Sequence, residues 1–132
     1  MTDHAFPIDF KTLKPGDKPN TFLVLPPGFQ ADAAPDLESP VFALEPAALL
    51  DAFKDTALTA PRTTVKREGE GQVELVQRSL VFRFPDTITA QACPVEGGSA
   101  LCVFSRSKVG YSDLGVNAKR VTAWLDALQK RV

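Results

Sequence analysis

The side chains that could do chemistry concentrate in one segment, residues 105–120, with the sequence SRSKVGYSDLGVNAKR. This segment contains the end of a predicted strand, a predicted turn at Gly110 and the start of the last predicted helix. The first N–H groups of a helix have no partners within it, so a helix N-terminus flanked by basic side chains attracts anions. The segment therefore predicts a site for an anionic small molecule or an acidic segment of a protein partner. The candidate ligand-binding residues are Arg106, Lys108, Tyr111, Ser112, Asp113, Asn117 and Arg120.

The same residues also fit a purely structural network. Asp113 would cap the final helix and pair with a neighbouring arginine, and Asn117 would satisfy backbone groups of the preceding turn. Arg78 lies on the mainly apolar face of its predicted strand, where its charge needs an acidic partner such as Asp86 or Asp113. We therefore assign Arg78 and Asp86 to a predicted structural network.

A catalytic function would have to use Asp, Tyr, Ser, Lys and Arg side chains. The only histidine, His4, lies at the N-terminal end of the sequence, which excludes His-based triads and multi-His metal sites. One alternative is a hydrolase or isomerase with Asp86 or Asp113 as general base and Tyr111 as general acid. A structural interaction subunit is another. The favoured interpretation is a non-enzymatic binding domain with no cofactor and no metal site.

The total charge is nearly balanced but unevenly distributed. The 132 residues include 15 basic and 16 acidic side chains, a net charge of -1. The pI is about 5.8, so nucleic-acid binding by a basic surface is not expected. Residues 1–60 carry four basic and nine acidic groups (net -5), and residues 61–132 carry eleven and seven (net +4). Either an acidic arm and helix pack on a basic sheet, or the neutral total hides a local anion-binding surface.

The sequence carries no signal for export or membrane insertion. The N-terminal residues MTDHAFPIDFKTLKPGDK contain no apolar run behind a basic start, which argues against a signal peptide. No stretch approaches the roughly 20 apolar residues of a membrane span. These patterns predict a cytoplasmic protein without a transmembrane segment.

The N-terminal third is rich in proline and phenylalanine. Eight of the eleven Pro lie at or before Pro46, and five of the nine Phe lie in the same segment. Proline fixes φ and removes a hydrogen-bond donor, which excludes a regular helix or a central strand there. A disordered tail would be poor in aromatic residues. We therefore predict an extended arm, residues 1–40, that packs on a single domain spanning residues 41–132.

Two amphipathic helices are predicted from apolar residues spaced three or four positions apart. The first begins at Pro46, whose fixed φ suits the first helical position, and ends before Pro61. The second follows Ser112 or Asp113 as its N-cap, and its apolar stripe includes Trp124 as a core residue. The other stripe residues are Leu49, Leu50, Phe53, Ala57 and Leu58 in the first helix and Leu114, Ala118, Val121, Leu125, Leu128 and Val132 in the second.

Between the helices, alternating and β-branched residues separated by glycine turns predict an antiparallel meander. Its strands are expected at residues 63–68, 72–84, 87–92 and 100–109. In the second strand, the apolar face is expected to hold Val76, Leu80, Phe82 and Phe84, with Arg78 among them. The predicted fold class is α+β: an antiparallel sheet of about four strands with two helices packed on one face, beside the extended Pro-rich N-terminal arm.

The two cysteines, Cys93 and Cys102, flank a predicted Gly97-Gly98 turn. If these glycines are the central turn residues, the cysteines lie directly opposite each other, within disulfide range. Pro94 opposes this register because it has no N–H to give at a hydrogen-bonded position. A disulfide and a pair of free thiols both stay open, and free thiols packed as small apolar side chains are favoured.

Three blocks of the sequence resemble a known family. They are residues 105–117 (SRSKVGYSDLGVN) with Arg120, residues 61–63 (PRT), and residues 78–86 (RSLVFRFPD). Together they resemble the bacterial and plastid family catalogued as domain of unknown function 1499, over roughly residues 39–130. The chain departs from the pattern of many members at residues 19–21 (PNT), where they carry Cys-Pro and Asn-Cys. The resemblance supports the fold and the domain limits and implies no particular activity.

Overall fold

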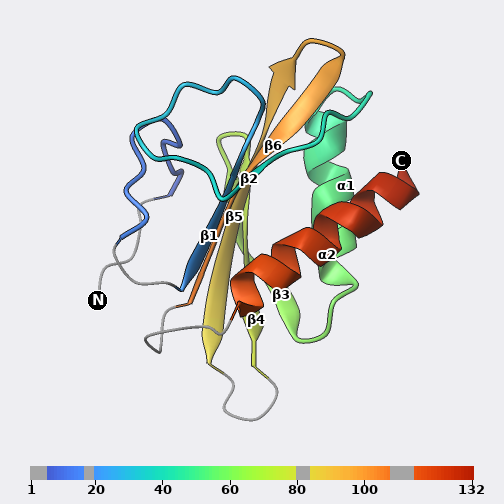
Figure 1. Cartoon of the computed structure of the whole chain (residues 1–132). Coiled ribbons are helices and arrows are strands. Elements are labelled where there is room, and N and C mark those ends of the chain that lie inside the picture. Colours follow the sequence, from blue (N-terminus) through green and yellow to red (C-terminus); the bar gives the residue numbers. More distant parts are fainter. Residues whose placement is uncertain (1–5, 17–19, 80–83, 108–114) are drawn as a thin grey trace.

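The computed structural model describes residues 6–16, 20–79, 84–107 and 115–132. Its strands are β1 (Thr21–Leu25), β2 (Leu37–Glu38), β3 (Thr63–Gly69), β4 (Gln72–Arg78), β5 (Pro85–Val95) and β6 (Gly98–Ser107), and its helices are α1 (Pro46–Leu58) and α2 (Val116–Arg131). The strands form one sheet in the order β2-β1-β6-β5-β4-β3 (Figure 1). β1 and β2 pair in parallel, and all other neighbours are antiparallel.

The described residues form a mixed sheet of six strands, where the sequence predicted about four antiparallel ones. The predicted meander is confirmed as β3 to β6. The exclusion of a central strand before Pro46 was wrong, because β1 lies between β2 and β6. Residues 20–25 contain no proline, so every backbone N–H of β1 is available for pairing, and the strand ends where Pro26 begins.

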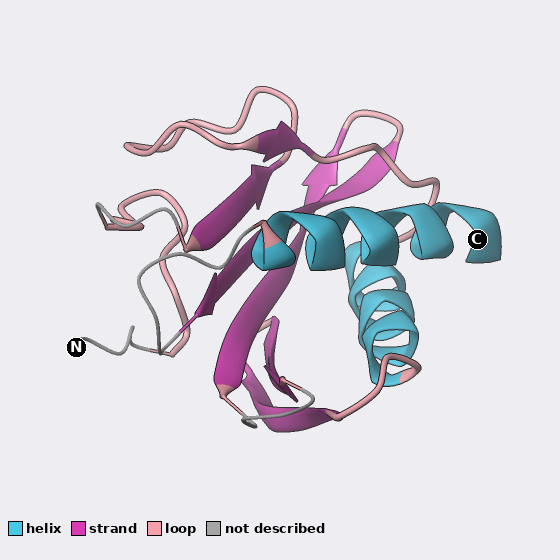
Figure 2. Ribbon diagram, turned by 60° about the horizontal axis from the view of Figure 1, so that its bottom comes forward, coloured by secondary structure: helices cyan, strands magenta, loops and turns pink. Residues whose placement is uncertain are grey.

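Both predicted helices form, and both pack on the same face of the sheet, which we call the helix side (Figure 2). α1 begins at Pro46 and ends at Leu58, as the fixed φ of proline and the apolar spacing predicted. The rings of Phe53 and Trp124 meet edge to face with centroids 5.9 Å apart, which confirms Trp124 as a core residue. The helix-side core also contains Leu49, Ala57, Val121, Leu125 and Leu128 from the helices and Val73, Leu75, Ile88, Ala90, Leu101 and Val103 from the sheet.

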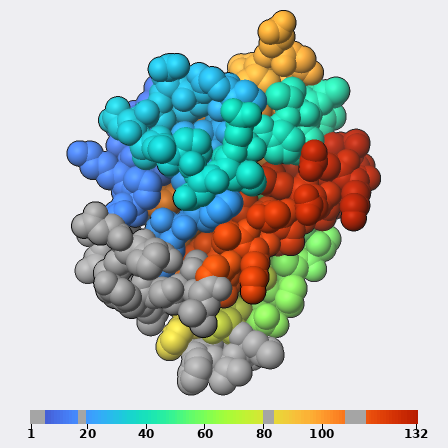
Figure 3. Space-filling view, viewed as in Figure 1, coloured from blue at the N-terminus to red at the C-terminus, as the bar shows by residue number. Residues whose placement is uncertain are grey.

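Residues 6–16, the described part of the chain before β1 that we call the arm, cover part of the opposite face, which we call the arm side. Ile8, Phe10 and Leu13 are buried there in a cluster that also contains Leu23, Leu25, Cys102 and Phe104. Gln72 of β4 anchors the arm, because its side chain accepts a hydrogen bond from the Ile8 N–H at 2.8 Å and donates to the Ile8 carbonyl at 2.6 Å. The segment between β1 and α1, coloured light blue to cyan in the space-filling view, lies beside α2 (Figure 3).

Both faces of β4 are buried near its start, which changes which side chains meet the helices. We expected Val76 and Arg78 to share the core face, but Val73 and Leu75 occupy it. Alternation along the strand therefore places Val76 and Arg78 on the arm side, together with the fully buried Glu74. Because a buried polar residue lies between two buried apolar ones, polarity along the sequence does not mark one face of this strand.

The β5–β6 hairpin turns at Glu96 and Gly97, one position earlier than predicted. Gly98 opens β6 with a φ of +147°. A Cβ atom at this position would lie 1.9 Å from the carbonyl oxygen of Phe42, whose backbone pairs with Ser99. The absence of a side chain on Gly98 therefore lets the segment before α1 lie against the hairpin.

α2 begins at Val116, with Gly115 as its N-cap residue. The prediction of Ser112 or Asp113 at the N-cap was therefore wrong. Gly115 has a φ of 80°, a left-handed conformation that glycine adopts without steric cost. Several predicted core and site positions lie outside the described residues, namely Leu80, Phe82, Lys108, Tyr111, Ser112, Asp113 and Leu114.

Candidate functional site: two charged networks on opposite faces of the sheet

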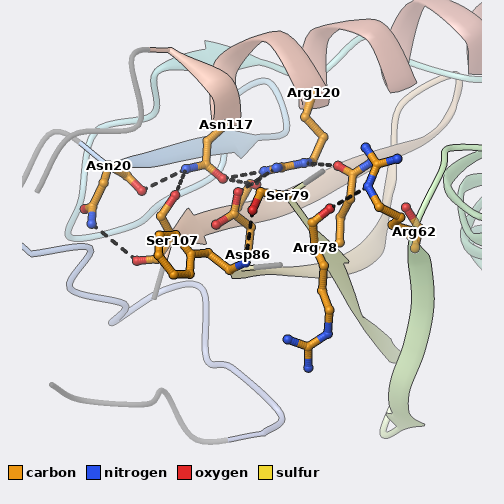
Figure 4. A network of polar contacts seen from close by, with 12 residues as sticks. Asn20, Arg62, Arg78, Ser79, Asp86, Ser107, Asn117 and Arg120 are labelled. Atoms are coloured by element: carbon orange, nitrogen blue, oxygen red, sulfur yellow. Dashed lines mark hydrogen bonds and ion pairs between the residues drawn. The ribbon is translucent and has the colours of Figure 1, made fainter. Parts of the chain in front are cut away.

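The Arg120 side chain lies in a polar cluster between α2 and the sheet (Figure 4). Its Nη2 atom lies 2.6 Å from Asp86 Oδ2, in an ion pair. Its Nη1 atom donates to Asn117 Oδ1 at 2.7 Å and to Ser105 Oγ at 3.1 Å, and its Nε donates to the side-chain carbonyl of Gln77. The side chain is only 7% exposed. Protein acceptors therefore surround this guanidinium, and Asp86 balances its charge.

Asn117 connects the cluster to the N-terminal part of the chain. Its fully buried side chain donates through Nδ2 to the Asn20 carbonyl at 2.9 Å and to Ser107 Oγ at 3.0 Å. Its Oδ1 accepts from Ser105 and Arg120. This amide therefore fixes the first turn of α2 against β1 and β6. We call Asn20, Gln77, Asp86, Ser105, Ser107, Asn117 and Arg120 the helix-side network.

A second set of charges surrounds Glu74 of β4 on the arm side. Glu74 Oε1 lies 2.8 Å from Arg67 Nε and 3.9 Å from Lys66 Nζ, both on β3. Its Oε2 lies 3.3 Å from Arg106 Nη2 and accepts from Thr89 Oγ1 at 3.1 Å. Three cationic side chains thus contact one fully buried carboxylate. We call Lys66, Arg67, Glu74, Thr89 and Arg106 the arm-side network.

The three cations of the arm-side network differ in exposure. The side chains of Lys66 and Arg67 are 44% and 43% exposed, whereas that of Arg106 is 13% exposed. Each guanidinium also lies over an aromatic ring: Arg106 is 4.9 Å from the Phe104 centroid, and Arg67 is 4.7 Å from the Phe6 centroid. Such cation–π contacts favour one orientation of the planar group. The positive charge of this network therefore reaches solvent mainly through Lys66 and Arg67.

The structure separates the predicted ligand-binding residues that it describes. Arg106 lies on the arm side with Cys102 and Phe104, because alternate residues of β6 point to the same face of the sheet. Asn117 and Arg120 lie on the helix side, where their spacing on α2 brings them together. The segment 105–120 therefore contributes to two networks. The other four candidates of this segment, Lys108, Tyr111, Ser112 and Asp113, lie outside the described residues.

The two residues predicted for a structural network also lie apart. Asp86 pairs with Arg120, within the helix-side network. Arg78 is exposed at the end of β4, and its backbone N–H donates to the Arg62 carbonyl at 3.1 Å while its own carbonyl accepts from Arg62 Nε at 3.0 Å. Figure 4 shows the Arg78 guanidinium pointing away from Asp86.

Glu74, Gln77 and Asn20 were not predicted as site residues from the sequence, although each belongs to one of the networks. Glu74 and Gln77 lie in a predicted strand, where polar residues are usually assigned to the solvent-facing side. They are covered by segments distant in sequence, so no local pattern marks them. Asn20 contributes through its backbone carbonyl, which any residue would supply, and through Nδ2, which donates to the Ser107 carbonyl at 3.3 Å.

Charge distinguishes the two networks. The helix-side network contains one cation and one carboxylate, whereas the arm-side network contains three cations and one carboxylate.

Over the described ranges, no group of three or more His, Cys, Asp or Glu side chains could hold a metal ion, and every buried polar side-chain atom has a hydrogen-bond partner. Neither described helix is long and apolar enough to cross a bilayer.

Comparison with known proteins places the chain in a family. No curated protein matches the sequence. The crystal structure of protein CV1439 from Chromobacterium violaceum is similar at 13% sequence identity and a TM-score of 0.40, over 83% of this chain and 97% of that one. The family model described as "Protein of unknown function (DUF1499)" matches residues 14–128. The resemblance seen in the three sequence blocks is thereby confirmed, and this chain belongs to the DUF1499 family.

Proposed function

We propose that this domain binds a small ligand carrying a carboxylate or phosphate group at the arm-side network, without transforming it. The supporting observation is the position of Lys66, Arg67 and Arg106 around the single carboxylate of Glu74. Even without Arg106, the two exposed cations Lys66 and Arg67 exceed the one negative charge of Glu74, so positive charge is left over within the arm-side network. An oxyanion next to these cations would balance that excess.

Each cationic side chain of the arm-side network would have a different role in binding the anion. Arg67 uses Nε for Glu74, and its exposed guanidinium offers the fork geometry that suits carboxylates and phosphates. Lys66 would add a mobile point charge from the neighbouring position of β3. Arg106, a ligand-binding candidate from the sequence, would act mainly by holding Glu74 from the opposite side, since its side chain is largely buried.

The helix-side network fits a structural role better than a binding role. The Arg120 guanidinium already contacts four protein acceptors and is 7% exposed. Asp86, a candidate general base, is engaged in its ion pair. A ligand there would have to displace these contacts, and breaking a buried ion pair typically costs about 3–5 kcal/mol.

Thermal unfolding of the intact chain tests the proposal. Sodium pyrophosphate or citrate is compared with sodium chloride at equal ionic strength, which separates binding from general screening. A ligand at 100 times its Kd adds about 2.7 kcal/mol to the stability of the wild type. The Lys66→Ala/Arg67→Ala variant should lose most of this gain, since it removes the two exposed cations and keeps the Arg106–Glu74 contact. Lys119→Ala, which removes an exposed cation from α2, is the matched control and should keep the gain.

Two results would contradict the proposal. One is an equal response of wild type and the Lys66→Ala/Arg67→Ala variant, which would place the anion elsewhere on the chain. The other is no response to either small anion beyond that to chloride. Binding of a polyglutamate peptide in that second case would instead favour an acidic protein segment as the partner.

A further inference from the structure

The two cysteines lie side by side beneath the arm. Cys93 of β5 is opposite Ala100 and Cys102 of β6 is opposite Gln91, so the cysteines are diagonal neighbours across the hairpin. Their Sγ atoms are 3.6 Å apart, and both thiols are free. A disulfide bond is about 2.05 Å long, so the two atoms need to approach by only about 1.5 Å to form one.

The two thiols differ in accessibility. Cys102 is fully buried in the arm-side cluster, where Phe10 and Leu13 of the arm also pack. Cys93 is half-buried at the margin of the same cluster. An oxidant arriving from solvent therefore meets Cys93 first, and Cys102 is placed to react with whatever Cys93 has bound.

The hydrogen bond between the thiols also makes them differ in reactivity, because it shifts their pKa values in opposite directions. The hydrogen bond with Cys102 lowers the pKa of Cys93 to about 6, with an opposing effect of burial and smaller lowering effects from the Gln91 amide and the charge of Lys11. The same hydrogen bond and burial raise the pKa of Cys102. These shifts favour the thiolate on Cys93 and the proton on Cys102, and the thiolate is the nucleophilic form.

We propose that Cys93 and Cys102 form a reversible redox pair that exchanges with a low-molecular-weight disulfide of the glutathione class. Cys93 Sγ attacks one sulfur of that disulfide, forms a mixed disulfide and releases the first small thiolate. Cys102 then gives its proton to solvent and attacks Cys93 Sγ, and the second small thiolate leaves as the Cys93–Cys102 bond forms. Two protein thiols are oxidised, and one external disulfide is reduced to two thiols.

Mass spectrometry of the intact chain tests this sequence of steps. The protein is incubated with glutathione disulfide at pH 7 and then treated with iodoacetamide to trap the remaining thiols. The wild type should lose the mass of two hydrogen atoms, carry no glutathione and resist iodoacetamide. Cys102→Ala should stop at one glutathione adduct on Cys93, whereas Cys93→Ala should stay unmodified because Cys102 is buried. Excess dithiothreitol should return the wild type to its starting mass.

The rate of iodoacetamide modification of Cys93 against pH provides a second measurement. In the wild type the rate should reach half its maximum near pH 6, and in Cys102→Ala this midpoint should move upward because the hydrogen bond between the thiols is lost. Circular dichroism of both variants shows whether they are folded. A wild type that retains the glutathione adduct, or that reacts only after unfolding in urea, would overturn the proposal.

Discussion

Arg106 and Arg120 hold carboxylates on opposite faces of one sheet. Arg106 contacts Glu74 on the arm side, and Arg120 contacts Asp86 between the sheet and α2. The two arginines belong to the same polar segment of the sequence, but the strand containing Arg106 ends before the helix containing Arg120 begins. Among the residues that the structure describes, the first carboxylate has three cationic neighbours and the second has one. The two networks therefore respond differently to the loss of a charge.

Removing Arg120 should destabilise the fold strongly. Arg120→Ala leaves the Asp86 carboxylate without its cation and Asn117 without one donor, a change that typically costs about 3–5 kcal/mol. Asp86→Ala should also destabilise, and the double variant should lose at least about 1 kcal/mol less than the sum of the single variants, because the two residues interact. Urea unfolding measures all three free energies.

Lys119→Ala is the control for that cycle. It removes an exposed cation from the same helix, and its free energy of unfolding should stay within about 0.5 kcal/mol of the wild type. Strict additivity of the Arg120→Ala and Asp86→Ala effects would show that the ion pair contributes no coupling energy.

Neutralising Glu74 should have opposite effects on stability and on anion binding. Glu74→Gln keeps the size of the side chain but removes the charge that three cations share, so the free energy of unfolding should fall by a few kcal/mol. The same cations would then face no carboxylate within the arm-side network. Calorimetric titration with pyrophosphate should give an affinity about tenfold higher than that of the wild type, which corresponds to about 1.4 kcal/mol. An unchanged or weaker affinity would argue against binding at this network.

A side chain at Gly98 should disrupt the contact between the β5–β6 hairpin and the segment before α1. Gly98→Ala places a Cβ atom 1.9 Å from the Phe42 carbonyl oxygen, so the backbone must move and lose its pairing with Ser99. We expect a loss of at least about 3 kcal/mol on urea unfolding, since strain and broken hydrogen bonds add. Gly28→Ala also has a positive φ but meets no atom within 4 Å, so it should cost only about 1–2 kcal/mol. Equal losses would show that the Phe42 contact is unimportant.

The Gln72 side chain should control the attachment of the arm. Gln72→Ala removes both hydrogen bonds to the Ile8 backbone, and hydrogen exchange of the Ile8 amide should become about tenfold faster. Gln91→Ala is the matched control, because it removes a neighbour of Gln72 and keeps both bonds to Ile8. Equal exchange rates of the Ile8 amide in the two variants would contradict this prediction.

The cysteine pair should make stability depend on pH under reducing conditions. Cys93 has a pKa of about 6 in the folded chain and about 8.5 when unfolded, so the unfolded chain binds more protons between these values and stability rises with pH. The raised pKa of Cys102 acts in the opposite direction above pH 8.5, where only the unfolded chain loses that proton. Relative to Cys93→Ala/Cys102→Ala, the wild type should therefore gain stability from pH 6 to about 8.5 and lose it above. If the difference in the free energy of unfolding between the two proteins does not change with pH, the opposite pKa shifts of Cys93 and Cys102 are contradicted.

Elements with local signals could be predicted from the sequence. Pro46 and the apolar spacing that follows it predicted α1, and glycine turns and alternation predicted the meander of β3 to β6. β1 could not be predicted, because its five residues lie between prolines and its main partner, β6, is distant in sequence. The start of α2 was placed too early because a polar side chain, Ser112 or Asp113, was expected as the N-cap. The N-cap is instead Gly115, which has no capping side chain and adopts a left-handed conformation.

The candidate site was predicted less completely than the fold. Strand alternation is enough to place Arg106 with Cys102 and Phe104, and helical spacing is enough to place Asn117 with Arg120. Neither pattern reveals which face of the sheet the helices cover, so the two arginines were assigned to one site. Glu74 was missed because its partners come from β3 and β6 and its burial depends on tertiary packing alone.

The pairing of β1 with β6 has a consequence for synthesis of the chain. β1 leaves the ribosome before β3, β4 and β5, but its antiparallel partners on β6, such as Ser105 for Phe22, follow only after all of these strands. Until then β1 has only the two-residue strand β2 to pair with. Such distant pairings slow folding. We therefore expect a nascent chain that stops before β6 to expose an incomplete sheet to chaperones, and release of the last strand to close the domain in a single late step.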